Sequence, residues 1–290
     1  MATNFPTNLD SLTNPSIGNN LNNPPHADQH ANANDAIEAL EAKVGINASA
    51  VTTSHDYKIA KLETGWVLVG DSWSYASADA PTFTITVPSG AASKYSVGMR
   101  IKLTQTTVKY FIITAVADTV LTVYGGTDYT LVNAAISAIS YSTHKAPLGF
   151  PLSPSKWTVE ATNSDLVTIS GPVGGTWYDA FGVVFITLPI GVWDFQYNVC
   201  LQGDDATAGA YYISITMSPT AAEETDADLT CATAENSALI RQTLSRRKTL
   251  TIASKTGYRF NMQNAVTGLD NIRIIGTSHK TIARAVCAYL

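Results

Sequence analysis

The chain has 290 residues and a formal net charge of -5, and only 14% of its residues are charged, against about 25% in an average soluble domain. Its length is sufficient for about two domains. The sequence has no apolar run long enough to cross a bilayer and no basic segment followed by an apolar one near Met1. We therefore expect neither membrane insertion nor a secretory signal.

The three cysteines, Cys200, Cys231 and Cys287, occur singly along the chain. Their odd number and the lack of a CxxC pair argue against a disulfide framework and against a structural zinc site. Small buried cysteines behave as hydrophobic side chains. We expect that role for all three.

The charge is unevenly distributed. Residues 241–290 hold nine Lys/Arg and one acid, whereas 158–239 hold no basic residue. One interpretation is an anion-binding surface, and the favoured alternative is pairing between an acidic and a basic face, within one subunit or between subunits. No RNP-like or helix-turn-helix pattern indicates a nucleic-acid partner. The clustered acids are Asp204, Asp205, Glu223, Glu224, Asp226 and Asp228.

Residues 1–25 are rich in Asn, Thr and Pro and carry one charge, Asp10. Such a composition cannot build a core. It predicts an extended arm that orders when it docks on a partner surface, with a plain disordered tail as the alternative. The apolar anchors of this arm would be Phe5, Leu9, Leu12, Ile17 and Leu21.

Residues 26–64 predict a helical stem in two segments. The first is 26–44, with Asp28 as a candidate N-cap and Gly45 as its end. The second segment lies within 46–64 and begins at Ser54 or Asp56. The heptad a and d positions of the first segment form a narrow seam that charged residues avoid, which is typical of a coiled coil between copies of one chain. The seam consists of His26, His30, Ala33, Ile37, Leu40 and Val44.

His26 and His30 extend this seam toward the start of the helix. If the coil reaches them, stacked rings of imidazoles would line its axis and could bind an anion or a metal ion. The favoured alternative is that the coil frays there and the two histidines are solvated or contact the surface on which the arm docks.

Residues 65–145 change to a period of two, which predicts a small β-module. Its expected strands are 83–87, 100–105, 109–116 and 119–125, followed by a turn and a strand within 129–142. The stretch APLGFPLSPSKW (146–157) contains three prolines and a glycine. This composition predicts a linker over residues 146–156.

Residues 157–290 contain ten short candidate strands with turn signals between them, the pattern of a β-sandwich or jelly roll. Expected strands include 180–188, 192–202, 238–245 and 248–254. Trp193 and Phe195 alternate with polar residues and are expected to face the core. The predicted fold class is therefore mainly β, with a short N-terminal α-helical coiled coil, a small β-module and a β-sandwich or jelly roll.

Trp177 and Tyr178 follow two glycines in a predicted loop. An exposed pair of this kind could stack on a sugar ring. Burial at a subunit interface is the favoured alternative.

No motif of a hydrolase, metalloprotease, P-loop or dinucleotide-binding site occurs. Asp204 with Asp205, and Asp226 with Asp228, could be paired carboxylates for glycoside hydrolysis. The six clustered acids, Asp204, Asp205, Glu223, Glu224, Asp226 and Asp228, could alternatively bind Ca²⁺, although no EF-hand spacing supports this. Solvated loop charge is the favoured interpretation of both pairs. We expect no enzyme, no catalytic residue, no cofactor and no metal site.

The stretch HADQHANANDAIEALEAKVG (26–45) resembles a segment near the N-termini of tail-fibre and head-fibre proteins of tailed bacteriophages. KAPLGFP (145–151) extends the resemblance over about 1–156. GVWDFQYNVCLQ (191–202) and ARAVCAYL (283–290) are similar to the TNF/C1q-like jelly rolls that tip such fibres.

The resemblance implies a homotrimer on the virion surface, made in the host cytoplasm. Its arm would dock on another virion structural protein of the tail, baseplate or capsid. Its tip would face outward for adhesion to a host glycan or protein. A head fibre or capsid-decoration protein is one alternative, and a glycan-degrading tip enzyme is an alternative of another class. The seam by itself does not choose three strands over two.

Overall fold

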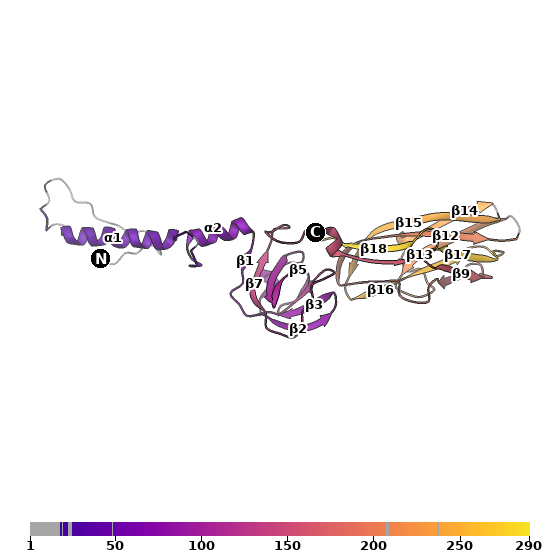
Figure 1. The fold of residues 1–290 in the computed structure, drawn as a ribbon, viewed down its shortest axis with the longest axis horizontal. Coiled ribbons are helices and arrows are strands. Elements are labelled where there is room, and N and C mark those ends of the chain that lie inside the picture. The colour runs from indigo at the N-terminus through magenta and orange to yellow at the C-terminus, as the bar shows by residue number, and fades with distance from the viewer. Residues whose placement is uncertain (1–17, 19, 23–24, 48, 207–208, 237) are drawn as a thin grey trace. The chain divides into compact units, whose positions relative to one another are not determined.

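The computed structural model describes residues 18, 20–22, 25–47, 49–206, 209–236 and 238–290 (Figure 1). The chain divides into two compact units, one up to Val67 and one from Leu68 to Leu290. Within these ranges no helix is both long and apolar enough to span a membrane. Leu21 of the predicted arm is exposed. The other predicted arm anchors, Phe5, Leu9, Leu12 and Ile17, lie outside the described residues.

The helix α1 (His26–Val44) has the predicted bounds. It begins directly after Pro25, whose φ of -55° suits a helix start. No side chain caps this end, so the expectation that Asp28 is the N-cap is wrong. Asp28 lies in the first turn, where its negative charge interacts favourably with the positive end of the helix dipole. The helix ends at Gly45, which has a φ of 88° and donates its N–H to the Glu41 carbonyl over 2.8 Å.

The helix α2 (His55–Thr64) begins with a side-chain cap. The Ser54 hydroxyl accepts the N–H of Tyr57 at 3.3 Å, so the Ser54 alternative is confirmed. Asp56 instead accepts the N–H of Ser49 at 2.9 Å and fixes the connection between the helices. The break at Gly45 thus produces the two predicted helical segments.

The β-module is one antiparallel sheet in the order β1–β7–β4–β5–β6–β3–β2. Its inner side chains are aliphatic and aromatic, and Phe83 and Phe111 meet edge to face at 6.2 Å. The predicted strands are confirmed. β1 and β2 were not expected, because their exposed residues show no apolar alternation. The elements are β1 (Val67–Leu68), β2 (Ser74–Asp79), β3 (Thr82–Thr86), α3 (Ala91–Lys94), β4 (Arg100–Gln105), β5 (Thr107–Val116), β6 (Val120–Tyr124) and β7 (Ser137–Ser142).

The remaining strands form a sandwich of two antiparallel sheets. The long strands of both sheets lie roughly along one common axis (Figure 1). One sheet has the order β10–β16–β13–β14, with β11 also on β16. The other has the order β8–β18–β12–β17–β9, with β15 also on β12. The predicted mainly β fold class is confirmed, whereas the coiled coil stays a prediction. The elements are η1 (Pro154–Trp157), β8 (Thr158–Asn163), β9 (Leu166–Ser170), β10 (Trp177–Asp179), β11 (Ile186–Leu188), β12 (Gly191–Asp204), β13 (Ala210–Ser218), η2 (Ala227–Leu229), β14 (Thr230–Asn236), β15 (Leu239–Ile252), β16 (Thr256–Asn264), β17 (Asn271–Ile275) and β18 (Thr281–Cys287).

Three strand expectations in this region are wrong. Segments 238–245 and 248–254 are one strand, β15, because all 14 residues pair with the equally long β12. Segment 180–188 is expected as one strand. Instead, two short strands pair with β16: β10, which ends just before this segment, and β11, which forms its last three residues. β14 was not expected because its sequence, TCATAEN, lacks large apolar side chains.

The two sheets meet through aromatic side chains. Phe195 of β12 packs on Tyr258 of β16 at 5.9 Å, and Tyr197 meets Phe260 edge to face at 5.4 Å. Trp193 is fully buried and donates its ring N–H to the Pro189 carbonyl. The expectation that Trp193 and Phe195 face the core is confirmed.

The β-module and the sandwich belong to the same compact unit. Tyr124 of β6 meets Trp193 of β12 edge to face at 5.0 Å. Phe150, within the segment expected as a linker, is buried and stacks on Trp157 at 5.1 Å. The Trp157 ring N–H donates to the Pro151 carbonyl at 2.7 Å. The segment 146–156 is therefore packed against both parts, and the predicted domain boundaries stay predictions.

Candidate functional site

The seam of α1 is exposed in the single chain. Ile37, Leu40 and Val44 keep 55%, 52% and 48% of their surface accessible, and no residue of α1 is buried. His26, His30 and Ala33 are exposed as well. An isolated helix of this length is marginal in water. The seam can therefore gain stability by packing on another helix, and it is the first candidate functional surface.

The two seam histidines contact each other within one helix. Their four-residue spacing places them on the same face. The Nε2 atoms of His26 and His30 are 3.0 Å apart, and the imidazole planes meet at 89°. One nitrogen donates and the other accepts.

The uneven charge of the sequence resolves into ion pairs. Arg247 bonds Asp194 at 3.0 Å and Arg259 bonds Asp179 at 2.6 Å. Lys255 reaches back to Asp79 of the β-module at 2.8 Å. Most basic residues of 241–290 thus face acids of the same chain, which confirms the favoured interpretation for these pairs.

The acids considered as catalytic or calcium-binding pairs are also engaged. Lys248 bonds Asp226 at 2.7 Å and Asp228 at 2.8 Å. The hydrogen bond from Lys248 lowers the pKa of Asp228, and the same pair of carboxylates raises the pKa of Lys248. Asp204 is bonded by Arg273 and by the Asn271 amide. In the part of the chain that the structure describes, no three His, Cys, Asp or Glu side chains gather as metal ligands.

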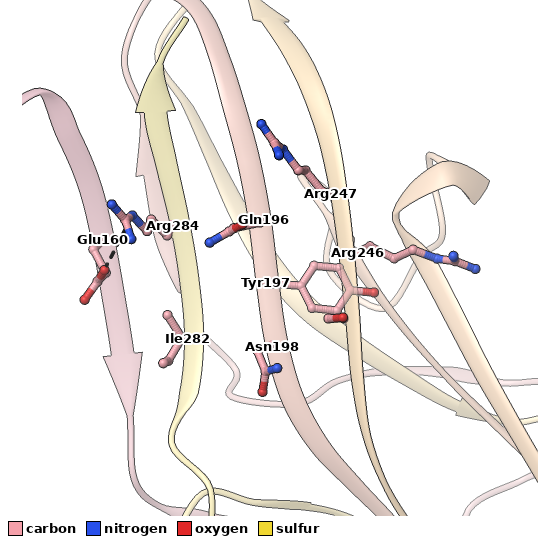
Figure 2. Close-up of a pocket in the computed structure, with 9 residues that line it drawn as sticks. Glu160, Gln196, Tyr197, Asn198, Arg246, Arg247, Ile282 and Arg284 are labelled. Carbon is pink, nitrogen blue, oxygen red and sulfur yellow. Dashed lines mark ion pairs between the residues drawn. The ribbon is translucent and has the colours of Figure 1, made fainter. Parts of the chain in front are cut away.

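A polar groove of about 530 Å³ lies on the outer face of the β8–β18–β12–β15 surface (Figure 2). Strand register builds it. Glu160 pairs in register with Arg284, Arg284 with Gln196, and Gln196 with Arg247. These four side chains form one row across four strands. The next row along the groove holds Asn198, Ser245 and Ile282.

The groove offers several hydrogen-bond donors. Arg284 faces Glu160 at 4.0 Å, and its Nε atom is buried without a hydrogen-bond partner. Arg247 remains largely exposed beside its partner Asp194. Guanidinium and amide groups at this spacing can hold a ligand that carries carboxylates or several hydroxyls. Sequence reasoning missed this groove because its members are distant in sequence, although the polar alternation of Gln196 and Asn198 opposite the core aromatics was a signal.

The predicted sugar-stacking pair does not lie in a loop. Trp177 and Tyr178 are half-buried residues of β10, where they pair with Gln263 and Met262 of β16. The Tyr178 hydroxyl accepts the N–H of Val173 at 2.9 Å. Because β10 belongs to the other sheet, this pair is separate from the polar groove, and its glycan contact stays a prediction.

All three cysteines are free and buried, as expected. Burial raises the pKa of the Cys287 thiol to about 11. Such a thiol is a poor nucleophile at neutral pH. Cys287 therefore acts as a packing residue.

Comparison with known proteins finds distant structural likenesses. Eiger TNF from S. frugiperda is 12% identical over 45% of this chain and 92% of its own, with a TM-score of 0.29. An infectious bursal disease virus structure (Gx strain) is 13% identical over 76% of this chain and 61% of its own, with a TM-score of 0.24. Dimeric latent PorU from Porphyromonas gingivalis is 10% identical over 75% of this chain and 24% of its own, also at 0.24. No family model and no curated protein matches the chain.

Proposed function

We propose that this chain is a structural fibre protein of a tailed bacteriophage, present on the virion as a homotrimer. The observation that carries the proposal is the narrow seam of α1, whose apolar residues Ile37, Leu40 and Val44 are exposed in the single chain. A stripe of this width fits another copy of the same helix better than a globular core. The resemblance of residues 26–45 to phage fibre segments supports the same function and supplies the number three.

The other parts follow from this arrangement. The Asn- and Pro-rich arm docks on a virion structural protein of the tail, baseplate or capsid. The β-sandwich is the exposed tip, and its low charge and aromatic interior suit a stable extracellular surface. A head fibre or capsid-decoration protein is the second candidate, since α1 would serve either location equally.

Solution mass tests the assembly. Light scattering of the full chain is expected to give the mass of three chains. Leu40→Asp puts a charge into the seam and should shift the mass toward one chain, while Glu41→Gln, one residue away and outside the seam, should not. A monomeric wild-type chain would contradict the proposal. A trimer that persists in Leu40→Asp would move the assembly contact to the β-strands.

Labelling of phage particles tests the location. An antibody against residues 157–290 is expected to decorate fibres that project from the particle. Decoration of the tail supports a tail fibre, and decoration of the capsid supports the head-fibre alternative. Particles that bind no antibody would contradict a virion protein.

The polar groove is the surface we propose for host adhesion. Its guanidinium and amide donors match glycans with carboxylates or dense hydroxyls. Gln196→Ala should weaken binding to host-cell polysaccharide, and Thr187→Ala, an exposed position on β11 of the other sheet, should not. Clearing of the polysaccharide by the purified protein would favour the enzyme alternative.

A further inference from the structure

We propose that His26 and His30 form a chelating site for a divalent transition-metal ion on α1. The two side chains are exposed on one face of the helix, and their Nε2 atoms are 3.0 Å apart. Imidazole is a preferred ligand of Ni²⁺, Cu²⁺ and Zn²⁺. The remaining histidines stand singly in the sequence, at His55, His144 and His279.

The spacing of the two nitrogens selects among these metals. With metal–nitrogen bonds of about 2.0–2.1 Å, nitrogens separated by 3.0 Å subtend about 91–97° at the ion. This angle is close to the right angle between neighbouring ligands in octahedral or square-planar complexes of Ni²⁺ and Cu²⁺. A tetrahedral Zn²⁺ site would require a separation of about 3.3–3.4 Å. The metal-free spacing is therefore closer to that of a Ni²⁺ or Cu²⁺ chelate, and Ni²⁺ is the probe for this site.

Binding requires both rings to turn, because without metal the two Nε2 atoms point at each other along a hydrogen bond. Without metal, one Nε2–H donates to the other Nε2. The ion takes the lone pairs of both Nε2 atoms, and the proton of the donor ring moves to its Nδ1, so no net proton is released. The positive end of the helix dipole disfavours a cation here, and Asp28 in the same turn offsets it.

Association of the chains would complete the coordination sphere. His26 and His30 extend the seam, so each copy in a trimer would place its own pair of imidazoles at the shared axis of the coiled coil. This extension rests on the proposed function, whereas chelation within one helix does not.

Calorimetric titration of the full chain with Ni²⁺ tests the site. A saturable site is expected, and His26→Ala and His30→Ala should each weaken Ni²⁺ binding roughly tenfold or more. His55→Ala, at the start of α2, should leave the affinity unchanged. Paramagnetic broadening of the imidazole NMR signals by Ni²⁺ should affect His26 and His30 before His55.

A rearranged variant provides the matched control. His30→Ala combined with Ala31→His keeps the number of histidines but places the second one about 140° further around the helix from the first. It should lose Ni²⁺ binding as the single variants do. Equal Ni²⁺ binding by this variant and the wild type would overturn the proposal.

The two proposals fail separately. Light scattering in the presence of a chelator reports assembly without metal. A metal-free trimer that binds no Ni²⁺ sinks only the metal site. A monomer that binds one Ni²⁺ per chain supports the chelate and sinks the trimer.

Discussion

Arg100 shows how one side chain holds distant backbone segments. It is 1% exposed and donates to the carbonyls of Gly98, Lys145 and Tyr289 over 2.7, 3.1 and 2.9 Å. Its guanidinium also lies over the Phe150 ring at 4.9 Å. These contacts connect β4 with the segment before the sandwich and with the C-terminal residues.

Arg100→Met should destabilise the β unit, because the carbonyls of Gly98, Lys145 and Tyr289 lose a charged donor. We expect a loss of about 2–4 kcal/mol in the free energy of unfolding, measured with guanidinium. Arg241→Met, on the exposed side of β15, should change it by less than about 0.5 kcal/mol. Equal effects of the two substitutions would show that the buried contacts of Arg100 contribute nothing.

Because of the buried Cys287 thiol, we expect the folded chain to lose stability at alkaline pH. Its pKa is raised by burial from 9.0 to about 11 in the folded chain. The contribution of the neutral Cys287 thiol to the stability of the fold is therefore complete below pH 9. It is lost as the pH rises toward 11, because only the thiol of the unfolded chain ionises in that range. Between pH 8 and 10 this contribution falls by about 1.3 kcal/mol.

The measurement is the free energy of unfolding of wild type and Cys287→Ala at both pH values. The variant should lose about 1.3 kcal/mol less than the wild type over this interval. Burial also raises the pKa values of Tyr124 and Tyr197, and both tyrosines are present in the two proteins. Parallel curves would contradict the role of Cys287.

The corner between α1 and α2 depends on few residues. Gly45 has a φ of 88°, and a Cβ there would lie 2.8 Å from the Cβ of Ser54. Ser54 donates to Val51 and Ser49, and caps α2 by accepting from Tyr57. Both residues carried a signal in the sequence, since glycine ends helices and serine begins them.

Ser54→Ala should remove this cap and cost α2 about 1 kcal/mol. Amide hydrogen exchange at Tyr57 and Lys58 should become faster, since the first turn opens more often. Thr53→Ala, an exposed neighbour outside the helix, is the control and should leave exchange unchanged. Unchanged exchange in Ser54→Ala would mean that the cap contributes nothing to the turn.

β12 and β15 show what strand patterns leave open. Alternation in β12 placed Trp193 and Phe195 in the core, and the structure agrees. The sequence of β15 is largely polar and carries two arginines and a lysine near its middle, which suggested two strands. It continues as one strand because every residue pairs with β12, and hydrogen bonding to a neighbour is not visible in local composition.

The β-module and the sandwich should unfold together, because Tyr124 packs on Trp193 and Phe150 stacks on Trp157. Trp193→Ala should lower the free energy of unfolding by about 3–5 kcal/mol. The decrease should be the same whether unfolding is followed by far-UV circular dichroism or by the accessibility of the thiols. Val108→Ala, an exposed position on β5, should have little effect. Two separate transitions of the β-strands would contradict one cooperative unit.

The sequence alone determined the features that depend on local chemistry. The bounds of α1, the glycine at its end, the serine cap of α2 and the inward aromatics of β12 follow from side-chain type and spacing. The burial of the three cysteines followed in the same way.

Only the tertiary structure decided which strands became neighbours. Strand pairing placed Glu160, Arg284, Gln196 and Arg247 in one row. It also brought Arg247, Arg259 and Arg273 within reach of their acids, Asp194, Asp179 and Asp204. It also packed the proline-rich segment against the β-module, because Phe150 meets Tyr110 of β5 and Trp157 meets Tyr124 of β6. These outcomes depend on contacts between residues distant in sequence, whose partners no local pattern specifies.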